Sequence, residues 1–402
     1  MTGKRTYWIW IFAAILMGAC SEHEEGTQPT SEYCNDDCIF VAKNDVRKAS
    51  GVGEDDTEET EPIIIGGFEK GDLLYFSQMP QGKDPNFSDF DKDAPNYLYI
   101  YEYNETENAS WSEGYNFQVH EDKKGFNWDD VLKVGPSGNA FKFFGFYFPV
   151  DQKPTWCVQT NQTGSEEDGY SKENFMKSDI MGAYHATSSI FTRMRFRLFH
   201  LMTYLKVTLY VPVYDGSSDN PDDLSYSGYN AGALKGGYVM DAITDFTIEW
   251  AVAKSSDSEA PLVQTKADAK KQHIQMYRHQ SDETAIKSLE VADYYSEPVD
   301  GITDGVDEVR TYHFSVLFPT QNFDGNFLCF ALQTPGGTTK YYYFSAAQLI
   351  SHDGDSFGLT QGTLQQLYLY LPRKTNQTVL VSAKILPWKD ATTDMTVNKQ
   401  SE

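Results

Sequence analysis

The stretch FRLFHLMTYLKVTLYVPV, residues 196–213, indicates most directly how this chain folds. In its second half, positions 205, 207, 209, 211 and 213 are leucine or valine, and Lys206, Thr208 and Tyr210 stand between them. Such alternation is typical of a β-strand, whose successive side chains point to opposite faces of a sheet. We therefore predict a strand with one apolar face turned toward a core.

Runs of the same kind flank this stretch on both sides. They are residues 38–42, 73–76, 97–103, 141–149, 246–253, 313–319, 327–334, 340–344, 367–372 and 378–388. The 26 Tyr and 25 Phe also favour strands, because aromatic side chains fit a pleated, half-buried surface. Residues 266–295 are rich in helix formers and are interpreted as an insertion between strands. Many short strands broken by Gly, Pro and Asn predict an all-β protein built of antiparallel sandwiches.

The length of 402 residues favours two domains of ordinary size. The strongest break in the middle of the chain is DGSSDNPDD, residues 215–223. We therefore predict an N-terminal β-sandwich domain over residues 38–215 and a C-terminal one over residues 216–402. Residues 1–19 are predicted to be a signal peptide and residues 20–37 a tether.

The first twenty residues have the pattern of an export signal. Lys4 and Arg5 precede an apolar run over residues 7–17, which is shorter than the roughly 20 apolar residues of a membrane span. The sequence that follows, MGAC at residues 17–20, resembles the lipobox of bacterial lipoproteins. This resemblance implies that Cys20 is lipidated and becomes the first residue. The alternative is an ordinary secretory signal with a chance cysteine.

The acidic residues after Cys20 predict where the protein is located. Ser21–Glu25 resembles the surface-export signal of lipoproteins in one phylum of anaerobic Gram-negative bacteria. The alternative is a solvated tether, and the two interpretations are compatible. The first implies a surface-exposed lipoprotein of the outer membrane.

The net charge of −25 argues against nucleic-acid binding, which relies on basic patches facing phosphate. The remaining cysteines are too few for a disulfide scaffold; they are Cys34, Cys38, Cys157 and Cys329. Cys34 and Cys38 are close enough in sequence to bridge in an oxidising compartment. Without a second ligand pair nearby, their spacing is a poor zinc signal.

Several stretches, taken in order, resemble the fimbrillin family, the two-domain lipoprotein pilins of the same bacteria. They are FEKGDLL at 68–74, the aromatic strand at 141–149, Asp179–Ala183, residues 196–209, HFSVLFPTQNF at 313–323, and the ending at 362–388 with Trp388. The resemblance implies two tandem transthyretin-like β-sandwich domains. It also implies a subunit or a tip or accessory component of a cell-surface fimbria (type V pilus) that serves adhesion.

In that family a trypsin-like protease removes the first strand, and the opened groove accepts a strand from a neighbouring subunit. The resemblance implies that residues 38–42 are this first strand and that Arg47 is the cleavage site. The donor strand would come from the C-terminal strands, such as Thr378–Ile385. Other fimbrial subunits and the outer membrane would then be partners. Some relatives keep their lipid as anchors or accessory tips, so cleavage at Arg47 stays open.

Motifs that resemble catalytic or metal sites lack the context that their chemistry requires. GDSFG at 354–358 matches a nucleophile elbow but leads into a strand rather than a helix. The acidic positions 89, 91 and 93 begin like an EF-hand, yet Ala94 and Ile100 replace its required Gly and Glu. His273 and His279 have no metal-ligand spacing, and His200 is interpreted as a core histidine. We predict no enzyme, no metal site and no cofactor.

The alternative function is a surface lipoprotein that binds glycans without polymerising. Aromatic residues that could stack on sugar rings are Trp111, Tyr115, Trp128 and Trp156. The same residues are also typical of β-sandwich cores and loop anchors. A host protein or a glycan is thus a further candidate partner.

Overall fold

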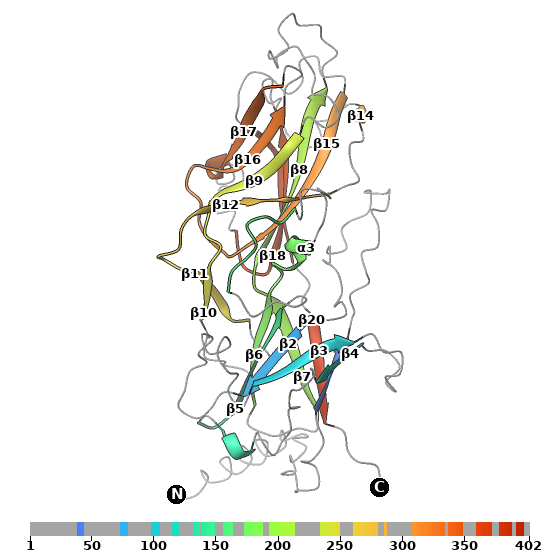
Figure 1. Cartoon of the computed structure of the whole chain (residues 1–402), viewed down its shortest axis with the longest axis vertical. Coiled ribbons are helices and arrows are strands. Elements are labelled where there is room, and N and C mark those ends of the chain that lie inside the picture. Colours follow the sequence, from blue (N-terminus) through green and yellow to red (C-terminus); the bar gives the residue numbers. More distant parts are fainter. Residues whose placement is uncertain are drawn as a thin grey trace, which may run out of the picture.

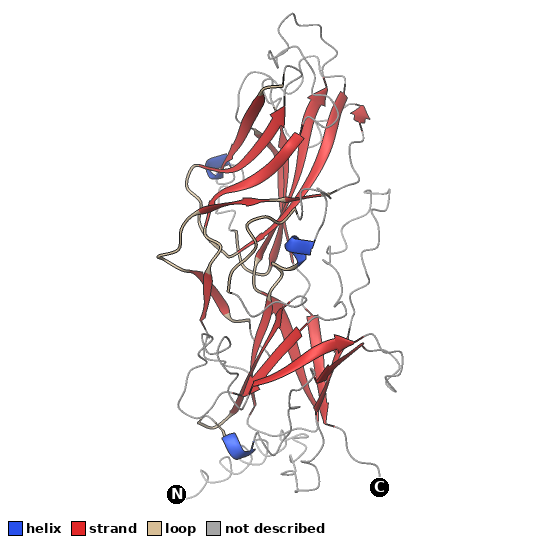
Figure 2. Cartoon of the chain, in the orientation of Figure 1, coloured by secondary structure: helices blue, strands red, loops and turns tan. Residues whose placement is uncertain are grey.

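A computed structural model of the chain describes its strands and the segments next to them. The described residues are 38–43, 73–78, 98–104, 115–119, 132–136, 138–148, 156–163, 173–187, 193–213, 234–249, 260–279, 285–287, 308–333, 337–348, 359–371, 378–387 and 391–397. Strands predominate over helices in this part of the chain (Figure 2), which confirms the predicted all-β class.

A closed barrel forms one end of the molecule, with the strand order β1-β20-β7-β6-β5-β2-β3-β4 (Figure 1). Its strands are β1 (Cys38–Lys43), β2 (Leu73–Gln78), β3 (Leu98–Asn104), β4 (Tyr115–Val119), β5 (Phe141–Phe148), β6 (Met181–Thr187), β7 (Arg193–His200) and β20 (Ala391–Val397). Neighbouring strands pair antiparallel all the way round. Both faces of β2 are buried, as the apolar run at 73–76 predicts.

Two further sheets form the other end of the molecule. One has the order β12-β9-β16-β17, and the other has the order β13-β15-β8-β18-β19 with β14 on β15. Their strands are β8 (Thr203–Val213), β9 (Leu234–Ala242), β12 (Gln272–Gln275), β13 (Tyr277–Arg278), β14 (Ala285–Lys287), β15 (Glu308–Phe318), β16 (Asn326–Gln333), β17 (Thr339–Ser345), β18 (Thr363–Tyr370) and β19 (Val379–Pro387). A separate ribbon pairs β10 (Phe246–Glu249) with β11 (Leu262–Thr265).

These two sheets pack face to face as a sandwich. Phe314 of β15 meets Phe330 of β16 with ring centroids 5.6 Å apart. A Cβ on Gly237 of β9 would lie 2.5 Å from the Met276 side chain and 3.0 Å from the Phe314 ring. A side chain would not fit there without a shift, so glycine permits the close approach of the sheets.

The stretch that opened the sequence analysis forms two strands, β7 and β8. They meet at Leu201 and Met202, where the Leu201 amide donates to the Ile180 carbonyl at 2.9 Å. The chain passes there from the barrel into the sandwich. The predicted apolar face of β8 is confirmed, because Leu205, Val207, Leu209 and Val211 are all fully buried.

The opposite face of β8 is also largely buried, with Tyr210 only 8% exposed. The cause is the central position of β8, which pairs antiparallel with β15 and parallel with β18. The parallel pair departs from the expectation of purely antiparallel sandwiches.

The predicted domain boundary at residue 215 does not separate the strands of the barrel from those of the sandwich. Before it, β8 lies in a sandwich sheet, and after it, β20 lies in the barrel. One contiguous cluster of buried apolar residues joins β2 and β5 to the sandwich strands. The division into domains 38–215 and 216–402 therefore stays a prediction.

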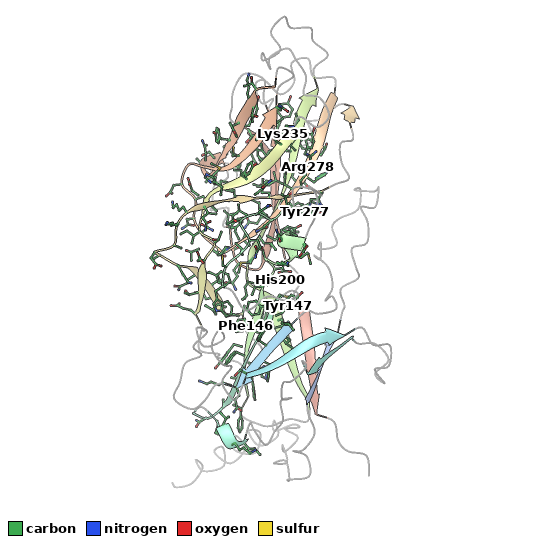
Figure 3. The ribbon with its side chains drawn as sticks, viewed as in Figure 1. Phe146, Tyr147, His200, Lys235, Tyr277 and Arg278 are labelled. Carbon is green, nitrogen blue, oxygen red and sulfur yellow. The ribbon has the colours of Figure 1, made fainter. Side chains whose placement is uncertain are left out.

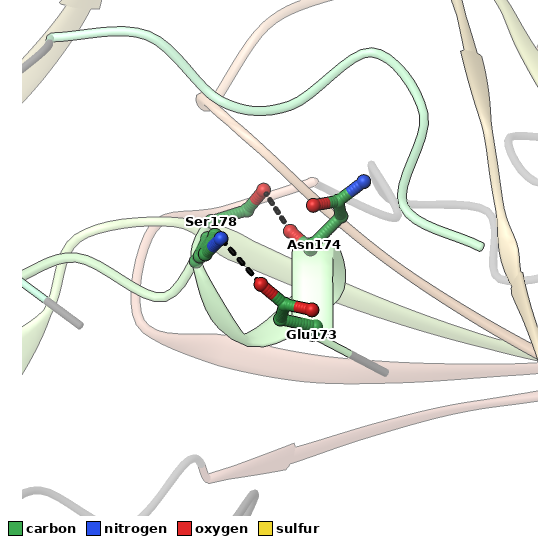
Figure 4. Close-up of polar contacts among 4 residues, drawn as sticks. Glu173, Asn174 and Ser178 are labelled. Atoms are coloured by element: carbon green, nitrogen blue, oxygen red, sulfur yellow. Dashed lines mark hydrogen bonds and ion pairs between the residues drawn. The ribbon is translucent and has the colours of Figure 1, made fainter. Parts of the chain in front are cut away.

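A short helix, α3 (Glu173–Met176), lies between the barrel and the sandwich (Figure 1). Lys177 forms an ion pair with Glu173 at 2.5 Å, and the Ser178 hydroxyl donates to the Asn174 carbonyl at 3.0 Å (Figure 4). Phe175 is buried and its ring lies 5.7 Å from that of Tyr204 in β8. The helix thus anchors the connection before β6 on the sandwich.

Trp156 joins the barrel to the ribbon. Its ring makes edge contacts with Phe146 and Phe148 of β5, at 5.0 and 5.3 Å, and with Phe246 of β10, at 5.9 Å. Such edge-to-face pairs contribute about 0.5–1.5 kcal/mol each beyond the area that they bury.

We expect Trp156→Ala to lower the free energy of unfolding by about 3 kcal/mol, because three ring contacts are lost and a cavity remains. Urea denaturation followed by circular dichroism measures the change. Leu262→Ala is the matched control, since Leu262 is 52% exposed and its loss should change stability by less than about 0.5 kcal/mol. Equal midpoints for the two variants would contradict the role given to Trp156.

Candidate functional site

The C-terminal strand lies in the barrel that the N-terminal strands form. β20 inserts between β1 and β7 and pairs antiparallel with both. Its pairs with β7 run from Ala391 opposite Leu198 to Thr396 opposite Arg193. A strand from one end of the sequence thus completes a sheet built from the other end.

The first strand, β1, closes the barrel on the other side of β20. All six residues of β1 have partners in β20, from Cys38 opposite Val397 to Lys43 opposite Thr392. Its other edge pairs with β4 over three residues, from Phe40 opposite Phe117 to Ala42 opposite Tyr115. β1 therefore holds its place through main-chain ladders on both edges.

In β-strand addition, an incoming strand binds through main-chain ladders of this kind. Main-chain hydrogen bonds give affinity to an added strand, and alternating side-chain pockets give it selectivity. If β1 leaves, the edges of β20 and β4 that it covered become templates for another strand. The candidate functional site is thus the place in the barrel that β1 occupies between β20 and β4.

The segment predicted as donor, Thr378–Ile385, lies largely in β19. It pairs with β18 along its length. Thr378 also donates from its amide to the Tyr343 carbonyl at 2.7 Å, and the Leu380 amide donates to Gln348 at 3.2 Å. This segment is held in the sandwich, and the C-terminal strand in the barrel is β20 instead.

Several of the residues and motifs singled out in the sequence lie outside the described residues. They are Cys20, Cys34, Arg47, GDSFG at 354–358 and the acidic positions 89, 91 and 93. Lipidation at Cys20 and cleavage at Arg47 therefore stay predictions. Cys38 begins β1, and the strand predicted at residues 38–42 is confirmed.

His200, interpreted as a core histidine, has a buried partner. Its Nδ1 lies 2.7 Å from Oδ1 of Asp179, and both side chains are 6% exposed. The pair lies where the barrel meets the sandwich, as the label in Figure 3 indicates. Because each group satisfies the other, the pair explains how two polar side chains are tolerated there.

His273 and His279, the other two histidines considered in the sequence, both lie in the described part of the chain. His273 is exposed, and His279 Nε2 lies 2.7 Å from the Ser315 hydroxyl. This spacing suits a nucleophile and its base, but Ser315 is fully buried and also contacts the Tyr204 hydroxyl at 3.0 Å. No group of three His, Cys, Asp or Glu that could hold a metal occurs among the described residues.

Two cysteines of the described residues are free thiols. Cys157 is half-buried and Cys329 is buried. Burial raises the pKa of Cys329 to about 11 and also raises that of Cys157. Both are therefore largely protonated and unreactive at neutral pH, because the thiolate is the reactive form.

Two of the four aromatic residues proposed for sugar stacking, Trp156 and Tyr115, lie among the described residues. Trp156 packs against the core, Tyr115 begins β4, and Trp111 and Trp128 lie outside the described residues. Among the helices that the structure describes, none has the length and apolar character that a membrane span requires.

Comparison with known proteins gives distant structural neighbours. No family model matches the chain, and no curated protein matches it. A candidate cell adhesion protein from Bacteroides uniformis is 13% identical with a TM-score of 0.41, and the match covers 90% of this chain and 100% of that one. One from Bacteroides ovatus is 12% identical with a TM-score of 0.40, over 80% and 89% of the two chains.

A third neighbour is the tip fimbrial protein Mfa3 from Porphyromonas gingivalis, with 8% identity and a TM-score of 0.30 over 80% of this chain and 95% of that one. The three neighbours are thus described as cell adhesion or fimbrial proteins.

The register of β1 and β20 predicts a specific disulfide. Cys38 lies opposite Val397, and directly opposed residues of an antiparallel pair have Cα atoms about 4.5–5.5 Å apart, within the range of a disulfide. We expect Val397→Cys to form an intramolecular disulfide with Cys38 under mild oxidation, detected by mass spectrometry and as a faster band on a non-reducing gel.

Thr396→Cys is the matched control. Position 396 is opposite Ile39 rather than Cys38. Equal crosslinking of the two variants, or a crosslink of Val397→Cys found only in dimers, would contradict the placement of β20 in its own barrel.

Proposed function

We propose that this chain is a structural subunit or a tip or accessory component of a cell-surface fimbria that serves adhesion. It is exported as a lipoprotein anchored through Cys20 and is assembled by β-strand addition after its first strand has been removed. The observation that supports this most is the position of β1, paired on both edges in the barrel and followed along the chain by Arg47.

When β1 is removed, β20 loses more residue pairs than any other strand does. β20 has six residue pairs with β1 and six with β7. Cleavage at Arg47 would leave β20 with only the second set, as an edge strand. An edge strand with half its ladder leaves the sheet more readily than an enclosed one and also offers an edge for pairing.

This gives cleavage a physical role in assembly. While β1 is present, β20 is enclosed in its own barrel and the monomer offers no strand position there. Once β1 is gone, β20 of one subunit is free to exchange into the barrel of the next. We therefore assign the donor role to Ala391–Val397 rather than to Thr378–Ile385.

We expect Arg47→Ala to block fibre formation, because β1 would stay in place. N-terminal sequencing of the surface protein should then find Cys20 as the first residue, and electron microscopy should show no fibres. Lys48→Ala is the control and should still polymerise. Wild-type fibres whose subunits begin at Cys20 would contradict removal of the first strand.

We expect Cys20→Ser to abolish incorporation of labelled palmitate and to release the protein from the outer membrane. A diacylated cysteine anchors stably because each buried CH₂ contributes about 0.8 kcal/mol and two chains are present. Cys34→Ser is the matched control and should keep its label. Undiminished label in the Cys20 variant would rule out the anchor.

A further inference from the structure

Three tyrosines gather on the outer face of the sheet formed by β12, β9, β16 and β17. Phe330 of β16 points inward to Phe314, so its neighbours Cys329 and Ala331 belong to the outer face. The register places Tyr238 of β9 and Tyr343 of β17 on either side of Cys329.

A second row lies next to the first. Gly236 of β9 and Tyr341 of β17 flank Ala331 of β16. The middle strand thus carries small side chains in both rows, whereas tyrosines stand on the strands beside it. Tyr341 is 50% exposed, so its ring is accessible to solvent.

The small side chains of β16 are covered, and the Tyr238 ring lies down on the sheet. Cys329 is only 3% exposed and Ala331 only 4%, although both belong to the outer face. A Cβ on Gly236 would lie 3.0 Å from the Tyr238 hydroxyl and 3.3 Å from its ring carbon Cε2. The absence of a side chain at Gly236 therefore lets the Tyr238 ring lie along β9, over position 236.

The tyrosines and the thiol also act on one another electrostatically. Burial raises the pKa of both Tyr238 and Tyr343, and the nearby Cys329 and Tyr341 raise it further. This is the behaviour of groups gathered on one small patch.

A lysine borders this patch because of a bulge in β9. The register between β16 and β9 shifts between Ala331 and Leu332, whose partners are Gly236 and Leu234. Lys235 is the extra residue, and at a bulge two residues oppose one. Lys235 is exposed and lies on β9 in the sandwich, as labelled in Figure 3.

We propose that Tyr238, Tyr341 and Tyr343, together with Lys235, bind a glycan that contains a carboxylate-bearing sugar. The C–H face of a pyranose ring stacks on an aromatic face, whose π cloud is negative. The phenol hydroxyls offer hydrogen bonds to sugar hydroxyls, and the ammonium group of Lys235 pairs with the sugar carboxylate.

The size and charge of the patch favour a sugar over a macromolecular partner. Two residues along a strand and two strand spacings across it give an area on the order of 100 Å². A stable protein interface buries about 800 Å² on each partner. The one lysine that borders the patch matches a single carboxylate.

The test measures binding of sugars to the purified full-length protein by saturation-transfer NMR and calorimetry. Sialyllactose and trigalacturonate are the two carboxylate probes, which distinguish a sialic acid from a uronic acid, and lactose and maltotriose are the neutral ones. We expect one carboxylate probe to bind, Tyr341→Ala to weaken it at least fivefold, and Tyr341→Phe to preserve it.

We expect Lys235→Gln to reduce the affinity for the carboxylate probe to that for the matching neutral sugar. Leu262→Ala and Lys271→Gln, at exposed positions outside the patch, are the controls for the ring and the charge. Circular dichroism verifies that the variants are folded. Absence of binding by all probes, equal losses in control and patch variants, or an effect of Tyr341→Ala on self-association alone would overturn the proposal.

Discussion

Main-chain pairing of β20 with β1 and β7 is the interaction on which the barrel depends. The two partners lie far from β20 in sequence, since Cys38 pairs with Val397. Without β20, β1 and β7 would have no common neighbour on that side, and the barrel would be an open sheet with two edges. β20, the most C-terminal of the described strands, thus closes the barrel that the N-terminal strands form.

The barrel and the sandwich are also joined away from β20. Gln162, between β5 and β6, donates to the Leu317 carbonyl of β15 at 2.7 Å and accepts from the Leu317 amide at 2.9 Å. Trp156, six residues earlier, packs between β5 and β10. These contacts do not involve β1 or β20, so an exchange of β20 would leave the link between the barrel and the sandwich in place.

The sequence predicted many of the strands because burial leaves long apolar runs, as in β5 and β16. It did not predict β20, whose residues ATTDMTV are mostly polar. Alternate positions there hold Ala391, Thr393, Met395 and Val397, and this weak period of two was the only available signal. Such a local pattern does not show with which strand β20 pairs, or in which register, when the partner β1 lies more than 350 residues away.

The same limit applies to the tyrosine patch. The run YYY at 341–343 predicted a strand, but its neighbours on the outer face are set by strand order and by the bulge at Lys235. A local pattern fixes which residues of one strand share a face, and only the fold decides what lies beside them.

Amide hydrogen exchange in residues 391–397 tests the central claim most directly. The account predicts slow exchange in the intact chain, because β20 is paired on both sides, and faster exchange once the residues up to Arg47 have been removed proteolytically, because one ladder is lost. Assembly into fibres should restore the protection. Fast exchange in the intact chain, or protection that is unchanged after removal of β1, would contradict it.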